Sequence, residues 1–365
     1  MDALTFEDFL DARAEWNAAL QRSNDNHIFE TWEWLSIWWR HYGDERRFIL
    51  VTVNDGKKML AAAPMMSSNY KLFGLRLAKI EFIATPASDY HTFLLSERKR
   101  ECAKMLIAHA ADTAAEWDCI ELQEIPDDSE TAKTLRTISK EPFKFEERAQ
   151  DRCPYVFLPD KFEGYLAKLG PSFRKNLHRY ERKLRKEYRV DFVICNDIET
   201  VDNAMKAFFD LHQKRWQSKK QAGAFSDQRF HDFHLDVARS FAERGWLTLD
   251  LLMLDDEPVA AGYNFKYGKK LFYYLSGFDP QYSGYNVGHL RHMYLIKHCI
   301  EQGLEEYDFM RGDEPYKLKW SASLRRNLQV RTMKRGIIPI FYDWITRNER
   351  LYPLTSELGK HLSVS

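Results

Sequence analysis

A dense group of ionisable side chains follows a short apolar segment near residue 310. Residues 307–310 are typical of a buried strand, and the polar residues begin where this strand should end. A carboxylate there could accept a proton from an attacking amine, and a phenol or ammonium group could stabilise developing negative charge. An alternative interpretation is a solvated turn held by ion pairs. The candidates for catalysis are Asp308, Asp313, Glu314, Tyr316 and Lys317, with Arg311 as a candidate substrate-binding residue.

A strand, a glycine-containing loop and a helix start follow one another between residues 270 and 302. The first N–H groups of a helix lack helical partners and carry positive potential, so this order is typical of an anion site. Gly284 and Gly288 would permit close backbone approach, and Asn286 could cap the helix. Neither a GxGxxG fingerprint nor a Walker A loop is present, and two turn glycines before an ordinary helix remain the alternative. The candidate cofactor-binding residues are Ser276, Gly277, Phe278, Gln281, Gly284, Tyr285, Asn286, Val287 and Gly288.

The most basic segment runs from residue 168 to residue 189 and holds nine Lys and Arg residues against two acidic ones. Pro171-Ser172 is typical of a helix start. Such a helix could bind nucleic acid, an anionic lipid surface or ligand phosphates, or it could present a merely solvated face. Its first turn, a polar helix end at 212–216 and a polar interruption at 89–91 supply further candidates. These candidate substrate-binding residues are Ser172, Arg174, Asn176, His212, Arg215, Trp216 and Asp89.

Helical and strand patterns alternate along the whole chain, which favours a mixed α/β fold. In the first half we expect helices at 6–20, 32–42 and 97–115, and strands at 48–53, 59–65, 78–84 and 119–122. In the second half we expect helices at 201–217, 228–244 and 287–302, and strands at 247–254, 259–265, 270–277 and 307–310. The two halves share this order but almost no sequence, so they are either a duplication or a chance recurrence.

The composition of the 365 residues fits a two-domain globular protein, because 44% are hydrophobic and a domain has about 150 residues. The 54 basic and 54 acidic residues cancel, which excludes the overall positive charge of a DNA-binding protein. No apolar run approaches the roughly 20 residues that span a bilayer, and we expect no signal peptide. Five scattered cysteines indicate a reducing, cytoplasmic environment, and no spacing suggests a metal site.

Several of these segments together resemble the CelD-like branch of the GNAT acyltransferase superfamily. That branch is associated with cellulose and exopolysaccharide gene clusters and is related to the FemABX peptidyltransferases. The resemblance covers residues 5–335 and rests on SFRKNL at 172–177, HQKRW at 212–216, PVAA at 258–261, GFDP at 277–280 and YDFMRGDEPYK at 307–317. It implies two tandem GNAT-like lobes, each a mixed, mostly antiparallel sheet flanked by helices. We expect an acceptor-side lobe at 1–155, an acyl-donor lobe at 156–335, and a tail at 336–365 that packs on the first lobe.

In GNAT proteins the donor is a CoA thioester, whose pantetheine lies between two splayed strands and whose pyrophosphate sits at the next helix start. The resemblance puts these strands at 270–277 and 307–310 and the pyrophosphate loop at 281–288, where Gln281 stands in place of the usual leading arginine. It implies transfer of an acyl group, most simply acetyl, to an amine of a small molecule or saccharide precursor. No metal is implied.

Two alternatives stay open. FemABX relatives use aminoacyl-tRNA and a lysine in a Phe-Lys segment, to which Tyr316-Lys317 is similar. The protein would then be a tRNA-dependent aminoacyl transferase, and tRNA is a partner under this alternative alone. A non-catalytic protein that binds an acyl group or a saccharide is the other alternative.

Overall fold

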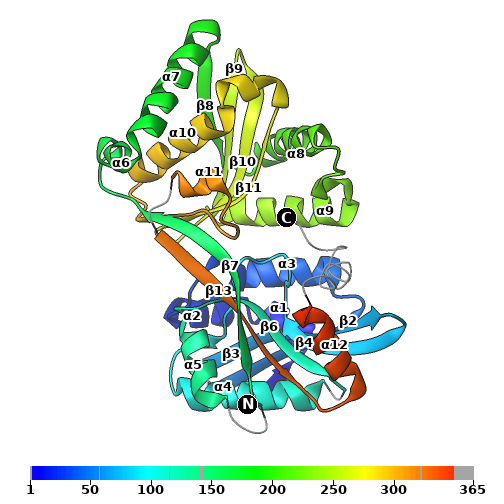
Figure 1. Ribbon diagram of the computed structural model, residues 1–365. Coiled ribbons are helices and arrows are strands. Elements are labelled where there is room, and N and C mark those ends of the chain that lie inside the picture. The colour runs from blue at the N-terminus through cyan, green and yellow to red at the C-terminus, as the bar shows by residue number, and fades with distance from the viewer. Residues whose placement is uncertain (1, 57, 115, 140–142, 321–322, 349–365) are drawn as a thin grey trace. The chain divides into compact units, whose positions relative to one another are not determined.

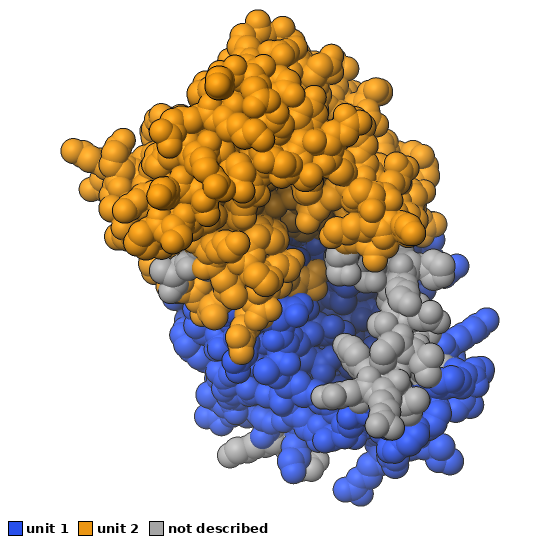
Figure 2. Space-filling view, turned by 45° about the horizontal axis from the view of Figure 1, so that its top comes forward, with its two compact units in different colours: residues 1–151, 325–365 blue, residues 152–324 orange. Residues whose placement is uncertain are grey.

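The computed structural model describes residues 2–56, 58–114, 116–139, 143–320 and 323–348 (Figure 1). The chain forms two compact units, coloured separately in Figure 2: unit 1 comprises residues 1–151 and 325–365, and unit 2 comprises residues 152–324. The lobes expected from the sequence divide the chain differently at 325–335, which lie in unit 1 because 327–333 pair with a strand there. Of the tail expected at 336–365, residues 349–365 lie outside the described part of the chain.

Unit 1 is built on a mixed sheet with the strand order β1-β2-β3-β4-β6-β13. Its neighbouring strands are antiparallel except β4 and β6, which run parallel. The elements are β1 (Asp2–Leu4), α1 (Phe6–Asp11), α2 (Arg13–Arg22), α3 (Trp32–Tyr42), β2 (Arg46–Asp55), β3 (Lys58–Leu72), β4 (Leu75–Phe82), β5 (Leu94–Leu95), α4 (Lys99–Thr113), β6 (Cys119–Pro126), α5 (Glu130–Ile138), β13 (Ser323–Met333) and α12 (Ile337–Arg347), with the short helix η1 (Ile28–Glu30).

Unit 2 repeats this plan with the strand order β7-β12-β11-β10-β9-β8, in which only β11 and β12 run parallel. Figure 1 shows α7 and α10 on one side of the sheet and α8 and α9 on the other. The elements are α6 (Phe162–Lys168), α7 (Pro171–Glu187), β8 (Val190–Cys195), α8 (Val201–Ser218), η2 (Ala224–Ser226), α9 (Gln228–Glu243), β9 (Leu247–Leu254), β10 (Glu257–Tyr267), β11 (Lys270–Phe278), η3 (Pro280–Tyr285), α10 (Val287–Glu301), β12 (Glu306–Asp308) and α11 (Pro315–Leu318), together with the end of β7 (Glu146–Phe157).

The expected fold class is confirmed: both sheets are mixed and mostly antiparallel, and helices flank them. Apolar side chains on the sheets and helices form a separate core in each unit. The expected helix at 6–20 is divided at Ala12 into α1 and α2. Strands β7 and β13 are absent from the prediction because much of each strand is exposed and polar, so neither has an apolar pattern to reveal it.

Candidate functional site

Strands β11 and β12 separate within unit 2 and leave one strand edge open. They pair at three positions, the last of which joins Phe272 to Asp308. Strand β12 ends there, while β11 continues to Phe278 with β10 on its other side. An opening between two parallel strands gives a ligand access to backbone groups that a neighbouring strand would otherwise occupy.

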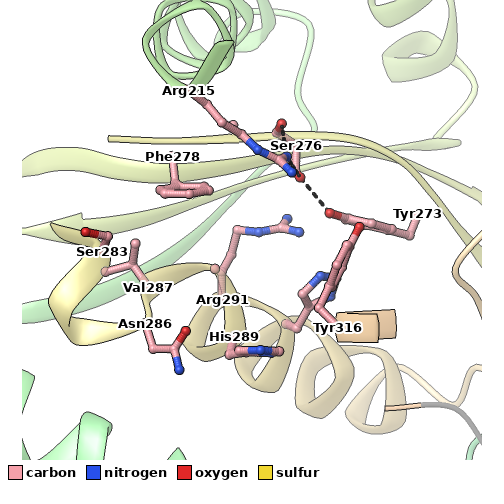
Figure 3. Close-up of a pocket in the computed structure, with 13 residues that line it drawn as sticks. Arg215, Tyr273, Ser276, Phe278, Ser283, Asn286, Val287, His289, Arg291 and Tyr316 are labelled. Carbon is pink, nitrogen blue, oxygen red and sulfur yellow. Dashed lines mark hydrogen bonds between the residues drawn. The ribbon is translucent and has the colours of Figure 1, made fainter. Parts of the chain in front are cut away.

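The opening borders a pocket of about 220 Å³ (Figure 3). The pocket lies between the edge of β11, η3, the first turns of α10 and a tyrosine of α11. Its lining contains two arginines and no carboxylate, which favours a ligand with negative charge. The lining residues are Arg215, Tyr273, Ser276, Gly277, Phe278, Ser283, Asn286, Val287, Gly288, His289, Arg291, His292 and Tyr316.

The start of α10 forms one end of the pocket. Asn286 occupies the N-cap position with a left-handed φ of 59°, but its side chain makes no capping hydrogen bond. The expectation that Asn286 caps the helix is therefore wrong, because this backbone conformation does not bring its side chain to the first-turn N–H groups. Those N–H groups and the positive end of the helix dipole are left for a ligand. A Cβ at Gly288 would meet no protein atom within 4 Å, so the space beside this turn is open.

A chain of hydrogen bonds crosses the opposite wall. Arg215 Nη1, from the end of α8, donates to Ser276 O and Oγ at 3.2 Å each. Tyr273 donates its hydroxyl to Ser276 Oγ at 2.6 Å and is also hydrogen-bonded to Tyr316. Burial, Tyr273 and Glu314 raise the pKa of Tyr316, so its phenol is protonated and can donate a hydrogen bond at neutral pH.

A buried ion pair lies behind this wall. Arg291 of α10 is 1% exposed, and its Nη1 donates to both oxygens of Asp250 on β9, at 2.9 and 2.7 Å. Although burial opposes it, the Asp250 carboxylate raises the pKa of Arg291 and keeps the guanidinium charged. Gly262 makes room for this pair, because a Cβ there would lie 1.6 Å from Arg291 Nη1. Residues 250, 262 and 276 form one row across β9, β10 and β11, so the pair lies level with the opening.

Three neutral histidines lie in or beside the pocket. Burial, together with nearby cations, lowers the pKa of His289 to about 4 and of His212 to about 3, and it lowers the pKa of His292 well below its usual value. His289 Nδ1 accepts from Trp320 Nε1 at 3.0 Å, and His292 Nδ1 lies 3.0 Å from the hydroxyl of Tyr307. His212 packs behind Gly277, where a Cβ would lie 2.3 Å from the His212 backbone nitrogen.

The structure brings some predicted residues together in the pocket and keeps others away from it. Those that line it are Arg215, Ser276, Gly277, Phe278, Asn286, Val287, Gly288 and Tyr316. The proposed acidic residues do not line it. Asp308 accepts the backbone N–H of Met310 at 2.8 Å, Asp313 lies 3.5 Å from Arg152, and Glu314 lies 3.0 Å from Lys317. Lys317 also donates to the Arg311 carbonyl and so holds the loop before α11 closed.

The other candidates surround the pocket or lie elsewhere. Asp279 fixes the start of the short helix η3, because it accepts hydrogen bonds from Gln281 N at 3.0 Å and from Lys214 at 2.8 Å. Within η3, Tyr285 is hydrogen-bonded to Glu187 of α7. The first two turns of α7 carry Ser172, Arg174 and Asn176, and Arg174 donates to the Leu166 and Ala167 carbonyls at 3.3 Å. The half-buried Trp216 donates to His212 Nε2 at 2.9 Å, Gly284 has open space, and Asp89 is buried in unit 1.

Five lining residues were missed by the sequence prediction: Tyr273, Ser283, His289, Arg291 and His292. A signal for one of them was present, because Arg291 is a charged residue in the otherwise largely apolar face of α10. Within the described residues, no group of three or more His, Cys, Asp or Glu side chains could hold a metal ion. A search of the same residues found no helix with the length and apolar character needed to cross a membrane.

Comparisons with known proteins agree with this architecture. Residues 171–318 match the family model for the acetyltransferase (GNAT) domain. No curated protein matches the sequence significantly. The fold is similar to that of FemX, with a TM-score of 0.64 and 12% identity over 94% of this chain and 100% of FemX.

Two further solved structures share the fold. The tandem GNAT protein of the clavulanic acid biosynthesis pathway gives a TM-score of 0.51 and 11% identity over 90% of this chain and 96% of its own. A C-terminal domain (DUF2156) assigned to a lysylphosphatidylglycerol synthetase of Agrobacterium fabrum gives 0.56 and 10% identity over 93% and 95%. At such identities the likeness concerns the fold alone. The pocket lies inside the segment 171–318 that matches the acetyltransferase (GNAT) domain, and this match supports an acyltransferase.

Proposed function

We propose that the protein is an acyl-CoA-dependent N-acyltransferase that acylates an amine of a small molecule or saccharide precursor. The observation that carries the proposal is the open edge of β11 beside the uncapped start of α10. An extended amide chain fits a strand edge, and a pyrophosphate fits a helix start. CoA contains both groups, joined in this order.

The residues present fit such a donor. The N–H groups at the start of α10 and the open space at Gly288 would hold the pyrophosphate. The basic helix α7 lies beside the loop that follows β11, with Lys183 Nζ 4.3 Å from the centre of the Tyr285 ring. Lys183 could therefore contribute to binding a further phosphate of the donor.

The thioester would supply a carbonyl carbon open to attack and a thiolate leaving group. We assign Tyr316 as the acid: its phenol is protonated, lines the pocket and can give a proton to the sulfur as the C–S bond breaks. We assign Glu314 as the base, acting through water, because its charge reaches Tyr316 and its side chain is half exposed. The amine forms the new N–C bond by attacking the thioester carbon before the C–S bond breaks, and it loses one proton through water to Glu314. Return of this proton to Tyr316 restores both groups. Asp308 and Asp313 remain alternatives, and Glu314 is preferred because its charge acts on Tyr316.

Thermal unfolding with acetyl-CoA, a long-chain acyl-CoA and free CoA tests the donor class. A ligand at about 100 times its Kd stabilises the folded state by about 2.7 kcal/mol, which raises the unfolding midpoint measurably. Release of free thiol in the presence of candidate amines then tests the transfer. Absence of any shift up to millimolar concentrations would exclude acyl-CoA as the donor.

A second candidate is a FemABX-type transferase that uses aminoacyl-tRNA. The basic α7 favours it, since a helix of this charge can bind an RNA backbone. Binding of tRNA should weaken steeply with salt, whereas binding of one CoA should show a shallow dependence. Measuring the salt dependence of each ligand therefore separates the two donors.

The acceptor and the setting follow from the sequence resemblance. The CelD-like segments favour an acceptor in polysaccharide or cell-envelope biosynthesis. The described cysteines form no disulfide with one another, which suits the reducing cytoplasm proposed for this reaction. Thiol release with amino sugars, compared with matched sugars that lack the amine, tests this part of the proposal.

A further inference from the structure

One guanidinium nitrogen in the pocket wall has no partner. Arg291 Nη1 is bound to Asp250, but Nη2 is buried and has no hydrogen-bond partner in the described structure. Figure 3 shows the side chain extending from α10 toward Tyr273 and Tyr316, and Arg291 lines the pocket. Buried N–H groups of a charged side chain are rarely left unpaired, because their lost hydration goes uncompensated. An unpaired donor on a side chain that lines a pocket therefore points to a ligand oxygen as its partner.

The surroundings favour an oxygen that carries negative charge. Arg215 lines the same pocket, and its Nη1 donates to the carbonyl and hydroxyl oxygens of Ser276, which are not carboxylates. Asp250, which balances the charge of Arg291, contacts it through Nη1, and Nη2 is left without a hydrogen bond to any described residue. With no Asp or Glu in the lining, one positive charge of the pocket stays unbalanced.

The sheet is also shaped to keep Arg291 in place. Gly262 sits between Asp250 and Ser276 in the cross-strand row, and any larger residue there would overlap Arg291 Nη1. The cation also lies over the Tyr273 ring, with Cζ 5.3 Å from the ring centre. Asp250, the space at Gly262 and the Tyr273 ring thus fix the position of the guanidinium, which is the preorganisation that specific binding needs.

We propose that Arg291 Nη2, together with Arg215, binds a carboxylate group of the substrate. The inference rests on the proposed function and narrows its substrate class. The carboxylate could belong to the acyl group of a dicarboxylic thioester or to an amino acid that serves as the acceptor. Both sources present the same chemistry to the pocket, and binding experiments separate them.

The first arm compares two donors that differ in the terminal group, succinyl-CoA and butyryl-CoA. The second arm compares L-alanine with L-alaninamide in the presence of saturating CoA. Kd values come from thermal shift and calorimetry, so no turnover is required. In one of the two arms we expect the ligand with a carboxylate to bind at least about tenfold more tightly than the ligand without it, equivalent to about 1.4 kcal/mol. The arm that discriminates identifies the source.

Arg291→Lys tests the residue itself. Lysine can still pair with Asp250 but lacks a second nitrogen. The preference for the ligand with a carboxylate should therefore fall below about threefold, while the protein still folds. Arg239→Lys is the matched control, because Arg239 forms a surface pair with Asp202 at 2.9 and 2.7 Å and lies outside the pocket lining. If Arg291→Lys does not fold, the double variant Arg291→Met with Asp250→Asn removes both buried charges and replaces it in the test.

The outcomes are distinct. A preference below tenfold in both arms overturns the proposal, and so does a preference that persists in Arg291→Lys. Failure of every CoA ligand to bind would overturn the proposed function instead. The alanine pair, repeated without CoA, would still test the carboxylate site in that case.

Discussion

Units 1 and 2 each contain one pair of parallel strands, β4 with β6 and β11 with β12, and each gathers buried charged side chains beside that pair. In unit 1 most of these charged groups bind one another, although Arg331 Nε is buried without a hydrogen-bond partner among the described residues. Lys79 Nζ donates to Glu121 at 2.7 Å and to the hydroxyl of Tyr342 at 2.6 Å, and Tyr342 contacts both oxygens of Glu121. In unit 2, Arg291 keeps an unpaired nitrogen at a pocket.

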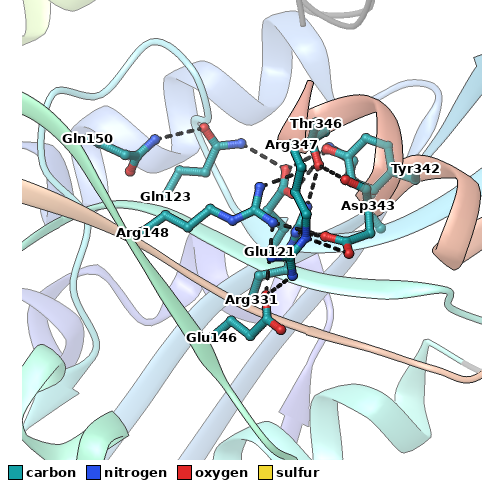
Figure 4. Close-up of polar contacts among 11 residues, drawn as sticks. Glu121, Gln123, Glu146, Arg148, Gln150, Arg331, Tyr342, Asp343, Thr346 and Arg347 are labelled. Atoms are coloured by element: carbon teal, nitrogen blue, oxygen red, sulfur yellow. Dashed lines mark hydrogen bonds and ion pairs between the residues drawn. The ribbon is translucent and has the colours of Figure 1, made fainter. Parts of the chain in front are cut away.

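Helix α12 accounts for much of this difference. Figure 4 shows Tyr342, Asp343 and Thr346 of α12 turned toward Glu121 and Arg331. Arg331 Nη1 donates to Thr346 Oγ1 at 2.9 Å, and its Nη2 pairs with Asp343. In unit 1 a helix thus covers the charged side chains beside the parallel strands, whereas in unit 2 a pocket lies beside them. We infer that the cluster covered by α12 serves stability and that the one beside the pocket serves binding.

The largest loss of stability should come from removing Lys79 from the buried cluster of unit 1. Lys79→Met leaves Glu121 with one less buried partner and should destabilise the protein by about 3–5 kcal/mol, measured by urea unfolding. Lys58→Met is the matched control. It removes an exposed pair with Glu97, whose side chains are 49% and 56% exposed, and should cost less than about 1 kcal/mol. Equal losses in the two variants would contradict the stability role of the cluster.

A fall in pH should change the stability of the two units in opposite directions. In unit 2, burial lowers the pKa of His212 to about 3 and of His289 to about 4, and it lowers the pKa of His292 well below its usual value. As the pH falls below about 6.5, these histidines bind protons in the unfolded chain but stay neutral in folded unit 2. Unit 2 therefore loses stability down to about pH 4. The raised pKa of the buried Asp250 opposes this loss by one proton.

Unit 1 should respond in the opposite direction. Burial raises the pKa of Asp25, Glu30 and Glu81, so folded unit 1 binds protons first and gains stability as the pH falls toward about 4.5. Native-state hydrogen exchange, corrected for the intrinsic rate, should show α10 losing protection between pH 6.5 and 4.5 while β3 retains it. His289→Gln should reduce the loss in α10. Parallel loss in both units would count against the assignment.

The next effect concerns chemistry. Tyr316→Phe removes the phenol that we assign as the acid but keeps its ring in the pocket, so kcat should fall about 100-fold while the Kd of acyl-CoA changes less than threefold. Tyr294→Phe is a suitable control, because Tyr294 binds Glu181 at 2.7 Å and lies outside the pocket lining. An unchanged kcat in Tyr316→Phe would remove this tyrosine from the mechanism.

Much of the fold could be predicted from periodicity. The apolar pattern of residues 32–42 gives α3 with its observed ends, and Asn54-Asp55-Gly56 predicts the β2–β3 hairpin, where Gly56 has a φ of 58°. Strands β7 and β13 could not be predicted, because their partners lie far away in the sequence and their exposed faces are polar.

The parts of the site that backbone geometry defines could be predicted from the sequence. The parts that side-chain contacts define were much harder to predict. The start of α10 follows from a strand, loop and helix in order. Spacing alone could not tell that Asp308 would bind a backbone N–H, or that Arg291 would be the buried cation of the pocket. Both outcomes depend on which neighbour each side chain meets in three dimensions.

The smallest effect that we expect is on the Kd of acyl-CoA when glycine is replaced by alanine. Two glycines are compared that both have open space around them but lie at different positions. A Cβ at Gly288 or at Gly284 would meet no protein atom within 4 Å, yet Gly288 lines the pocket and Gly284 does not. Gly288→Ala should leave the fold intact, because alanine favours a helix more than glycine does, by up to about 1 kcal/mol. Its Cβ would occupy space beside the first-turn N–H groups, so the Kd of acyl-CoA should rise about tenfold.

Gly284→Ala controls for the change in backbone freedom and should leave the Kd unchanged. The same calorimetric titration serves both variants, and their unfolding midpoints report the fold independently. If both substitutions weaken binding equally, the loop acts through its flexibility and not through open space at the helix start. If neither does, the donor does not approach α10 at Gly288, and unit 2 would differ from unit 1 by an open pocket that serves the acceptor alone.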